Sequence, residues 1–280
     1  MSTLASARSL LFTPGSDARK LVRALQTPAD VIVVDLEDAV PPAEKSRARS
    51  LAAEHLADPE TPSVLALRIN GAGTTFWEED LRLVDELELG AVVLPKATPA
   101  AARELPPDGP PVVAVIETAK GLKQAYETAS ASRVAGLLLG AVDLGIELRL
   151  EARQDGQEVL YARSQLVLDS AAAGIRSPFD LVHLHARDEA GLEAECRLAR
   201  SLGFRGKACI HPAQVGVINR VFSPSEEEVV QARRLVEAYE TGTEEGLGAV
   251  ALDGEMVDLA VVDRARQVLA EAERNALDGN

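Results

Sequence analysis

Residues 112–118 read Val112-Val113-Ala114-Val115-Ile116-Glu117-Thr118, a run of strand-forming aliphatic residues that ends in a carboxylate. A continuous apolar run of this kind is typical of a strand that is covered on both faces, as in a parallel sheet. An ionised carboxylate at its end is costly unless cations or hydrogen-bond donors compensate it, so Glu117 is either a salt-bridge member or a metal ligand. Residues 134–140 repeat the pattern and lead to a second acid, Asp143. Two adjacent parallel strands would place both acids at one rim.

Eight apolar runs recur along the chain, and polar, Ala- and Glu-rich segments of helical period lie between them. The runs are 8–13, 31–36, 63–69, 91–95, 111–118, 134–140, 178–184 and 206–211. The candidate helices are 17–27, 42–56, 76–89, 119–130, 189–202 and 212–221. This alternation, in a chain of 280 residues, predicts an α/β fold, a closed (β/α)8 TIM barrel over residues 1–222.

Two regions do not fit this repeat. Residues 144–175 form a long insertion after the sixth run, with a helix predicted over 159–173, and could cover the barrel mouth. Residues 223–280 contain two helical stretches joined by the glycine-rich segment 242–254. We therefore expect a C-terminal helical extension, which could cover the site of a neighbouring subunit.

The composition excludes several classes of function. With 44 acidic and 29 basic side chains the formal charge is −15, which opposes binding to nucleic acid and docking on an anionic membrane. The chain has no signal-peptide pattern and no apolar run of membrane-spanning length, so we expect a cytoplasmic protein. Cys196 and Cys209 are too few for a disulfide framework or a thiolate metal site, and we expect both in the core.

Polar and charged residues follow most of the predicted strands, where the loops at the C-terminal face of a barrel build an active site. They are Asp35, Glu37 and Asp38 after the second run, Arg68 and Asn70 in the third, Lys96 after the fourth, Glu117 in the fifth, Asp143 after the sixth, and Lys207 with His211 in the eighth. So many charged strand ends are difficult to explain by a structural network alone, and we expect an active site there.

Glu117 and Asp143 offer oxygen ligands without a nearby Cys or paired His, which favours a hard cation such as Mg²⁺ over zinc. Mg²⁺ commonly accepts one or two carboxylates and keeps waters and a chelating substrate. Asp35, Glu37 or Asp38 could orient those waters. The alternative is a buried ion pair between Glu117 and Arg68 without a metal.

The same strand ends offer further candidate site residues. Arg68 offers a planar fork for a carboxylate or an enolate oxygen, and the small residues at 140–142 would let backbone N–H groups approach a substrate carboxylate. Lys96 could form a Schiff base, although acidic neighbours raise the pKa of its amine and work against this. For His183 and His185, which have no carboxylate at metal-ligand spacing, we favour core or surface positions.

Taken together, the motifs are Arg8 through Gly15, Asp35-Leu36-Glu37-Asp38, Arg68-Ile69-Asn70, Leu94-Pro95-Lys96, Ile116-Glu117-Thr118, Gly140 through Leu144, and Gly206-Lys207 through Ile210-His211-Pro212. In this order they resemble the citrate lyase beta-subunit (CitE-like) family of the HpcH/HpaI aldolase superfamily, from residue 8 to about residue 262. The resemblance implies a Mg²⁺-dependent carbon–carbon lyase that cleaves or forms a 3-hydroxyacyl-CoA such as citryl-, malyl- or citramalyl-CoA. The products would be acetyl-CoA and a 2-oxo acid, namely oxaloacetate, glyoxylate or pyruvate. It also implies a homo-oligomer, a trimer or a hexamer.

The resemblance assigns roles to individual residues. By motif, Glu117 and Asp143 become metal ligands, Arg68 the substrate clamp, and Gly140, Ala141 and Val142, together with Glu117, the surroundings of the oxo acid. The mobile C-terminal acid of the family corresponds to Asp258, and Glu37 and Asp38 are further catalytic candidates. Pro14, Gly15, Arg19 and Lys20 are expected near the CoA phosphates.

Other classes of function remain open from the sequence. In a multi-subunit citrate lyase this chain would act on a substrate held by a carrier subunit and be inert alone, or it could bind CoA without activity. An aldolase of free 2-oxo acids is a nearer alternative. The identity of the acyl-CoA depends on pocket shape, which the sequence does not reveal.

Overall fold

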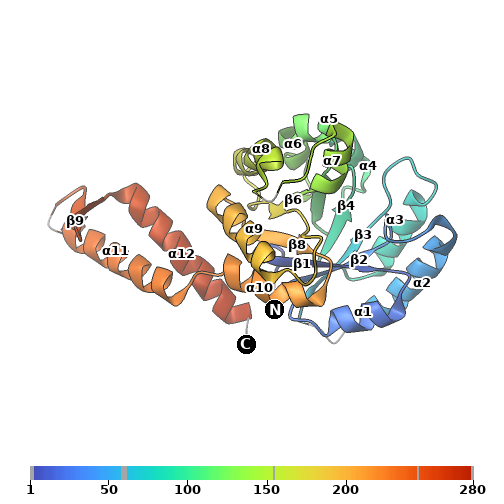
Figure 1. Ribbon diagram of the computed structural model, residues 1–280, viewed down its shortest axis with the longest axis horizontal. Helices are drawn as coiled ribbons and strands as arrows, with labels where there is room; N and C mark the ends of the chain where they lie inside the picture. The colour runs from blue at the N-terminus through green and yellow to red at the C-terminus, as the bar shows by residue number, and fades with distance from the viewer. Residues whose placement is uncertain (1–2, 58–61, 154, 245, 279–280) are drawn as a thin grey trace. The chain divides into compact units, whose positions relative to one another are not determined.

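The computed structural model describes residues 3–57, 62–153, 155–244 and 246–278. These residues form two compact units, one that extends to Phe222 and one that begins at Ser223 (Figure 1). No described helix combines the length and the apolar character needed to cross a membrane.

The first unit is a closed barrel of eight parallel strands in sequential order, which confirms the predicted fold (Figure 1). The strands are Ser9–Pro14 (β1), Val31–Asp35 (β2), Val64–Arg68 (β3), Ala91–Leu94 (β4), Val112–Ile116 (β5), Val134–Leu139 (β6), Phe179–Asp180 (β7) and Gly206–Cys209 (β8). The α-helices are Ala18–Leu25 (α1), Lys45–Leu56 (α2), Trp77–Glu86 (α3), Pro99–Glu104 (α4), Ala119–Lys123 (α5), Ala125–Ala129 (α6), Ala141–Leu148 (α7), Leu160–Ala172 (α8), Glu189–Leu202 (α9) and Pro212–Phe222 (α10). Short 3-10 helices, Pro42–Glu44 (η1) and Gln157–Val159 (η2), precede α2 and α8.

The alternation of side chains along the strands divides the core into two layers. Val33, Ala66 and Val113 belong to the cluster inside the barrel, whereas residues one position away, such as Val34 and Leu67, pack against the helices. Because side chains two positions apart point to the same side, Asp35, Arg68 and Glu117 continue the inward-facing series of β2, β3 and β5. Strand periodicity thus places three charged groups at the mouth of the barrel.

The region 144–175 differs from its prediction in one respect. The helix expected over 159–173 is present as α8, and it packs against β6, α6 and α9 in the outer ring. It is therefore the crossover helix that parallel strands β6 and β7 require, rather than a cover for the mouth. The residues near the mouth are instead those of the short helix α7, which the sequence analysis did not predict.

The second unit contains Glu226–Glu244 (α11), Val250–Leu252 (β9), Glu255–Val257 (β10) and Leu259–Asp278 (α12). Strands β9 and β10 form an antiparallel hairpin with a turn at Asp253-Gly254, where φ is +52° and +86°. Asp-Gly is a strong hairpin signal, since both central residues of such a turn need positive φ. The hairpin was not predicted from the sequence, where this stretch was expected only as a glycine-rich link between two helices.

Candidate active site

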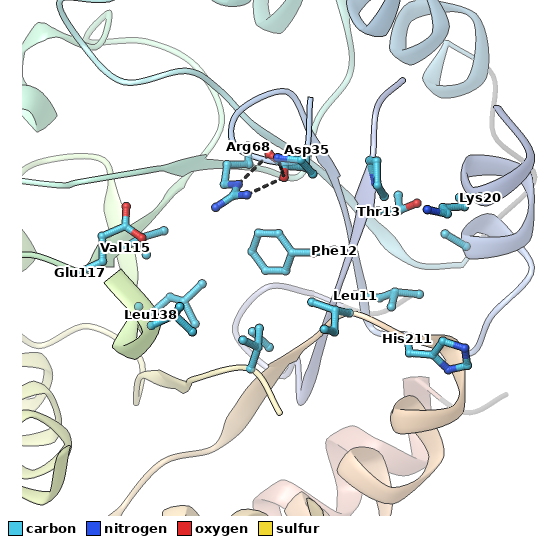
Figure 2. A pocket seen from close by; sticks show the side chains of 18 of the residues that line it. Leu11, Phe12, Thr13, Lys20, Asp35, Arg68, Val115, Glu117, Leu138 and His211 are labelled. Atoms are coloured by element: carbon cyan, nitrogen blue, oxygen red, sulfur yellow. Dashed lines mark hydrogen bonds and ion pairs between the residues drawn. The ribbon is translucent and has the colours of Figure 1, made fainter. Parts of the chain in front are cut away.

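A pocket of about 560 Å³ lies at the C-terminal ends of the barrel strands (Figure 2). Its charged lining residues are Lys20, Arg23, Asp35, Arg68, Glu117 and Asp143. Gly140, Ala141 and Val142 line it as well. The pocket therefore brings together both predicted metal ligands, the predicted clamp and the predicted surroundings of the oxo acid.

Arg68, the last residue of β3, is held by two carboxylates from the neighbouring strand β2 and its loop. Its Nε and Nη2 donate to Asp35 Oδ1 and Oδ2 at 2.7 and 2.5 Å, and its Nη1 lies 3.1 Å from Glu37 Oε2. The guanidinium also lies 5.4 Å from the Phe12 ring (Figure 2). Burial works against its charge, but the hydrogen bond and charge of Asp35 outweigh this and raise the pKa of Arg68. Arg68 is thus a fixed cation, with the remaining N–H groups of Nη1 and Nη2 available to a ligand.

Glu117 follows β5 and is only 3% exposed. Its Oε1 accepts a hydrogen bond of 2.6 Å from the backbone N–H of Lys96. Burial, with contributions from Glu37 and Asp143, raises the pKa of Glu117 to about 7. No ion pair joins Glu117 to Arg68 within the described residues, so the proposed metal-free pair between them is wrong. The positive charge near Glu117 therefore does not fully compensate the negative charge of its buried carboxylate.

Gly140 allows Asp143 and Glu117 to share one site. A Cβ at position 140 would lie 2.3 Å from Glu117 Cβ and 2.8 Å from Glu117 Oε2, so only glycine fits between β6 and this side chain. The chain then turns directly into α7, and Asp143 lies half-buried in its first turn. The N–H of Gly140 donates to Ile116 O at 3.0 Å, and the N–H groups of Ala141 and Val142 belong to the first turn of α7, where the helix offers them no acceptor.

These residues fit a Mg²⁺ ion. Glu117 is a buried carboxylate without a full counter-charge, and Asp143 adds a second carboxylate to the same pocket. The described residues contain no group of three or more His, Cys, Asp and Glu side chains arranged to hold a metal. Two carboxylates with room for waters and a chelating ligand are the donor set that Mg²⁺ accepts, and unlike a zinc site they need neither Cys nor His.

Glu37 does not line this pocket; with Asp38 and Lys96 it lines a second cavity of about 670 Å³. Lys96 Nζ donates to Glu37 Oε1 at 2.9 Å, and this bond raises the pKa of Lys96. The pairing with Glu37 favours the protonated amine and works against a Schiff base at Lys96. Burial raises the pKa of Glu37, while Asp38 is exposed at the cavity rim.

A polar network behind Glu37 was not foreseen from the sequence. Lys45 Nζ donates to Leu36 O, Glu37 O and Asn70 Oδ1 at 2.6–2.7 Å, so all three of its protons are used. The Asn70 amide in turn donates to Asp80 Oδ2 at 2.6 Å. This network fixes the backbone that carries Glu37. Asp80 lies on a helix and is fully buried, which the sequence does not show.

The CoA-binding candidates divide into two groups. Pro14 and Lys20 line the first pocket, whereas Gly15 and Arg19 do not. The Gly15 N–H donates to Asp35 O at 2.8 Å, and a Cβ there would lie 3.0 Å from the same oxygen, so Gly15 serves close packing between β1 and β2. Two lining residues, Arg23 and His211, extend the basic side of the pocket. Arg23 was missed, although it follows Lys20 by three positions on α1 and therefore shares its helix face.

Lys207 is not at the mouth, contrary to the prediction. It is 0% exposed and lies on the helix-facing side of β8, one position before the inward-facing Ala208. Its Nζ contacts Asp180 Oδ2 at 2.9 Å and Glu195 Oε2 at 3.1 Å. His183 is also buried and pairs with Glu195 at 2.9 Å. Lys207 belongs to a structural ion network between the barrel and its helices, and His183 hydrogen-bonds to the Glu195 of this network. Cys196 and Cys209 are buried, as expected.

Asp258, the remaining predicted site residue, lies in the second unit. Its Oδ1 accepts a hydrogen bond of 3.1 Å from Val261 N, so its carboxylate caps the N-terminus of α12. A cap keeps one oxygen occupied and leaves the other free to act.

A family model described as "HpcH/HpaI aldolase/citrate lyase" matches residues 8–212, and one described as a carbon–carbon bond lyase of the TIM-barrel fold matches residues 152–274. The chain belongs to the HpcH/HpaI aldolase/citrate lyase family. This confirms the family indicated by the sequence motifs. Members of this family with similar sequences include citrate lyase subunit beta of Leuconostoc mesenteroides subsp. cremoris, which is 37% identical over 96% of this chain and 94% of that protein. A (3S)-malyl-CoA thioesterase of Cereibacter sphaeroides is 38% identical over 95% of this chain and 94% of that protein.

Solved structures of this family match most of the chain. CitE of Mycobacterium tuberculosis in complex with magnesium, acetoacetate and coenzyme A matches with a TM-score of 0.84 and 35% identity, over 96% of this chain and 100% of that one. A structure of the M. tuberculosis citrate lyase beta subunit with oxaloacetate and magnesium matches with a TM-score of 0.71 and 36% identity, over 79% of this chain and 99% of that one.

Proposed function

We propose that this protein is a Mg²⁺-dependent carbon–carbon lyase that cleaves, or forms, a 3-hydroxyacyl-CoA from a 2-oxo acid and acetyl-CoA. The observation that carries the proposal is the presence of Glu117, Asp143 and Arg68 in one pocket, where two carboxylates suit Mg²⁺ and a fixed cation has donors to spare. The ligands of the M. tuberculosis relatives, which include magnesium, oxaloacetate and coenzyme A, support the same chemistry.

Glu117 and Asp143 would hold the Mg²⁺ ion. When bound, Mg²⁺ supplies a Lewis acid for the carboxylate and hydroxyl oxygens of the substrate. The chain orients the same end of the substrate through the N–H groups of Ala141 and Val142, which have no partner inside α7 because they belong to its first turn. The positive end of the helix dipole favours a carboxylate at this position.

Arg68 acts on the other half of the substrate. As the carbon–carbon bond breaks, its electron pair moves into the thioester and forms an enolate. At the same time the hydroxyl group releases its proton to solvent, and the carbon that carried it becomes the carbonyl of the oxo acid. The free N–H groups of Arg68 are placed to stabilise the enolate oxygen. Asp35 and Glu37 keep the guanidinium in place before the charge develops, so little reorganisation is needed.

An acid must then protonate the enolate carbon. Glu37 is one candidate, because burial raises the pKa of its carboxyl and its Oε2 lies 3.1 Å from Nη1 of Arg68, the group proposed to face the enolate. Exposed Asp38 supports this role indirectly, since its negative charge also raises the pKa of Glu37. In the reverse reaction the same group would remove the proton from acetyl-CoA.

Asp258 is the second candidate, and we place it in the site of a neighbouring subunit of a trimer or hexamer. Proton transfer at carbon typically contributes about 10²- to 10⁴-fold, so Asp258→Asn should lower turnover on that scale while Mg²⁺ and oxo acid still bind. Asn retains the oxygen that caps α12, so the fold should persist.

Mixing inactive Asp258→Asn and Glu117→Gln proteins under subunit exchange tests this placement. Delivery between subunits would create some sites with both groups intact and restore part of the activity. Proven exchange without any recovery would exclude delivery in trans, and full activity of Asp258→Asn alone would remove this residue from the mechanism.

Pro14, Lys20 and Arg23 would bind the CoA end, with Gly15 and Arg19 in the adjoining turn and helix. Two cations on α1 suit phosphate groups, which accept charge-assisted hydrogen bonds. The experiment that tests the proposed function is incubation of the purified protein with citryl-, malyl- and citramalyl-CoA and Mg²⁺. Turnover by the protein alone supports a stand-alone lyase, whereas turnover only with a carrier-bound substrate supports a citrate lyase subunit.

A further inference from the structure

We infer that Lys96 is a positioning residue for the proposed reaction and holds the Glu37 carboxylate in the direction from which it can protonate the enolate carbon. The inference rests on the proposed function and deepens it, because it assigns a task to a residue that lines the second cavity rather than the pocket. It depends on the backbone conformation at Lys96 and on the two acids that this residue contacts.

The backbone at Lys96 has a conformation that lysine rarely adopts. Its φ is +47°, and it is one of only three residues other than glycine with positive φ in the part of the chain that the structure describes. Strand β4 ends at Leu94, and the chain then turns so that the N–H of Ala97 donates to Val115 O at 3.0 Å. Glycine or asparagine would form this turn with less strain, so the turn alone does not explain a lysine.

The turn gives Lys96 a contact with each of two acids. Its backbone N–H donates to Glu117 Oε1 at 2.6 Å, and its Nζ donates to Glu37 Oε1 at 2.9 Å. Every residue except proline supplies the N–H, so only the contact with Glu37 requires a lysine. The Lys96 side chain is 51% exposed, and such ion pairs add little stability. Backbone strain that accompanies a weakly stabilising contact indicates a functional role for that contact.

The contact with Lys96 determines which way the Glu37 carboxylate points. Its Oε1 is bound by Lys96, and its Oε2 lies 3.1 Å from Nη1 of Arg68. Arg68 lines the pocket (Figure 2), so Oε2 is the oxygen next to the proposed enolate. Glu37 and Lys96 both line the second cavity of about 670 Å³, which has room for the carboxylate to turn away from Arg68. Without the ammonium group, we expect the carboxylate to leave its present direction.

This direction matters for proton transfer between oxygen and carbon. In bond formation, Glu37 Oε2 would take a methyl proton of acetyl-CoA, and the electron pair of the broken C–H bond would form the enolate beside Arg68. Cleavage follows the same path in reverse, and the Glu37 carboxyl returns the proton to carbon. A misplacement of about 1 Å can slow such a step about 100-fold. Loss of the Lys96 ammonium should therefore lower kcat by about this factor.

Lys96→Gly tests this role. It removes the ammonium, keeps the N–H that contacts Glu117 and relieves the strain of positive φ. Turnover should fall about 100-fold, while the Mg²⁺ affinity measured by calorimetry with pyruvate and the melting temperature should not decrease. A large loss of melting temperature would make the ion pair structural, and weakened Mg²⁺ binding would mean that Lys96 acts on Glu117. Either result would overturn the inference.

Arg149→Gly is the matched control. Arg149 is another exposed cation with positive φ, at +55°, and it lines neither cavity. This variant should keep normal turnover, which separates the loss of the Lys96 ammonium from the effect of a glycine at such a position. Lys96→Arg keeps a cation that can reach Glu37, so its kcat should exceed that of Lys96→Gly by at least about tenfold. Equal losses in the two Lys96 variants would contradict the inference.

A double-mutant cycle shows whether Lys96 acts through Glu37. In a Glu37→Gln background, Lys96→Gly should lower kcat by less than about twofold, because the carboxylate to be positioned is absent. Losses that multiply in the double variant, or full activity of Glu37→Gln alone, would overturn the inference and leave the proposed function intact. If the unsubstituted protein cleaves none of citryl-, malyl- and citramalyl-CoA, the proposed function itself is refuted.

Discussion

Glu117→Gln and Asp143→Asn are each expected to abolish Mg²⁺-dependent turnover and to weaken Mg²⁺ binding by more than about 100-fold. Loss of a residue that only supports a metal ligand already lowers affinity about 10- to 100-fold, so loss of a ligand itself should exceed that range. Titration calorimetry with Mg²⁺ and pyruvate measures the effect. Unchanged binding in either variant would remove the proposed metal site.

The fold should survive the Glu117 substitution. The side-chain amide oxygen that Glu117→Gln introduces can still accept the Lys96 N–H, and the buried charge is removed. Because the pKa of Glu117 is raised in the folded state, the folded protein binds more protons than the unfolded chain between about pH 4.5 and 7. Ionisation of Glu117 therefore lowers the stability of the metal-free protein as the pH rises through about 7. Glu117→Gln should therefore leave the melting temperature unchanged or higher above pH 7.

The raised pKa of Glu117 also predicts a pH dependence of Mg²⁺ binding. Mg²⁺ needs the ionised carboxylate, so the Mg²⁺ affinity of the unsubstituted protein should decrease as the pH falls below about 7. Glu147→Gln is the matched control, because Glu147 is an exposed carboxylate on the same helix as Asp143 but outside the pocket lining. It should bind Mg²⁺ normally and keep this pH dependence.

Arg68→Lys is expected to lower kcat by about 10²- to 10³-fold, the usual effect of removing one donor from a developing oxyanion. Lysine keeps the charge, but its single nitrogen cannot bind both oxygens of Asp35 in a planar fork, approach Glu37 and still face an enolate. Steady-state kinetics on the best acyl-CoA substrate measures the change. A raised KM with normal kcat would make Arg68 a ground-state binder instead.

Arg8→Lys is a control that separates the effect of losing a bidentate Arg–Asp pair on stability from any effect on turnover. Arg8 donates to both oxygens of Asp30 at 2.8 Å, in the same bidentate arrangement but at the start of β1, the opposite end of the barrel. Both variants should lose similar stability, and only Arg68→Lys should lose turnover. Equal losses of turnover would mean that the Arg68 effect is structural.

The fold and much of the site could be predicted because both depend on strand periodicity. Each apolar run became a barrel strand, although β7 is reduced to Phe179–Asp180. Asp35 and Arg68 are direct partners in the parallel register of β2 and β3. Because both side chains point into the barrel, they meet at its mouth. Glu117 follows the same phase two strands further on.

The failures have a common physical reason, since they depend on register or on tertiary contacts. Lys207 lies in an apolar run as Arg68 does, but it has the opposite phase and faces the helices, which only the pairing of β8 with β1 reveals. Lys45 and Asp80 come from different helices, and Asn70 links them only because α2 and α3 pack together. The hairpin in the second unit has three-residue strands with exposed Glu255 and Met256, too short and too polar for an alternating pattern to be recognised.

The most direct test of the central claim is product analysis after incubation of the purified protein with citramalyl-CoA, with Mg²⁺ in one sample and excess chelator in the other. Carbon–carbon cleavage at the Glu117–Asp143 site predicts acetyl-CoA and pyruvate in equal amounts with Mg²⁺, and neither product with chelator or in Glu117→Gln protein. Release of free CoA with the intact hydroxy acid would show thioester hydrolysis instead and contradict the account, as would cleavage that proceeds unchanged without Mg²⁺.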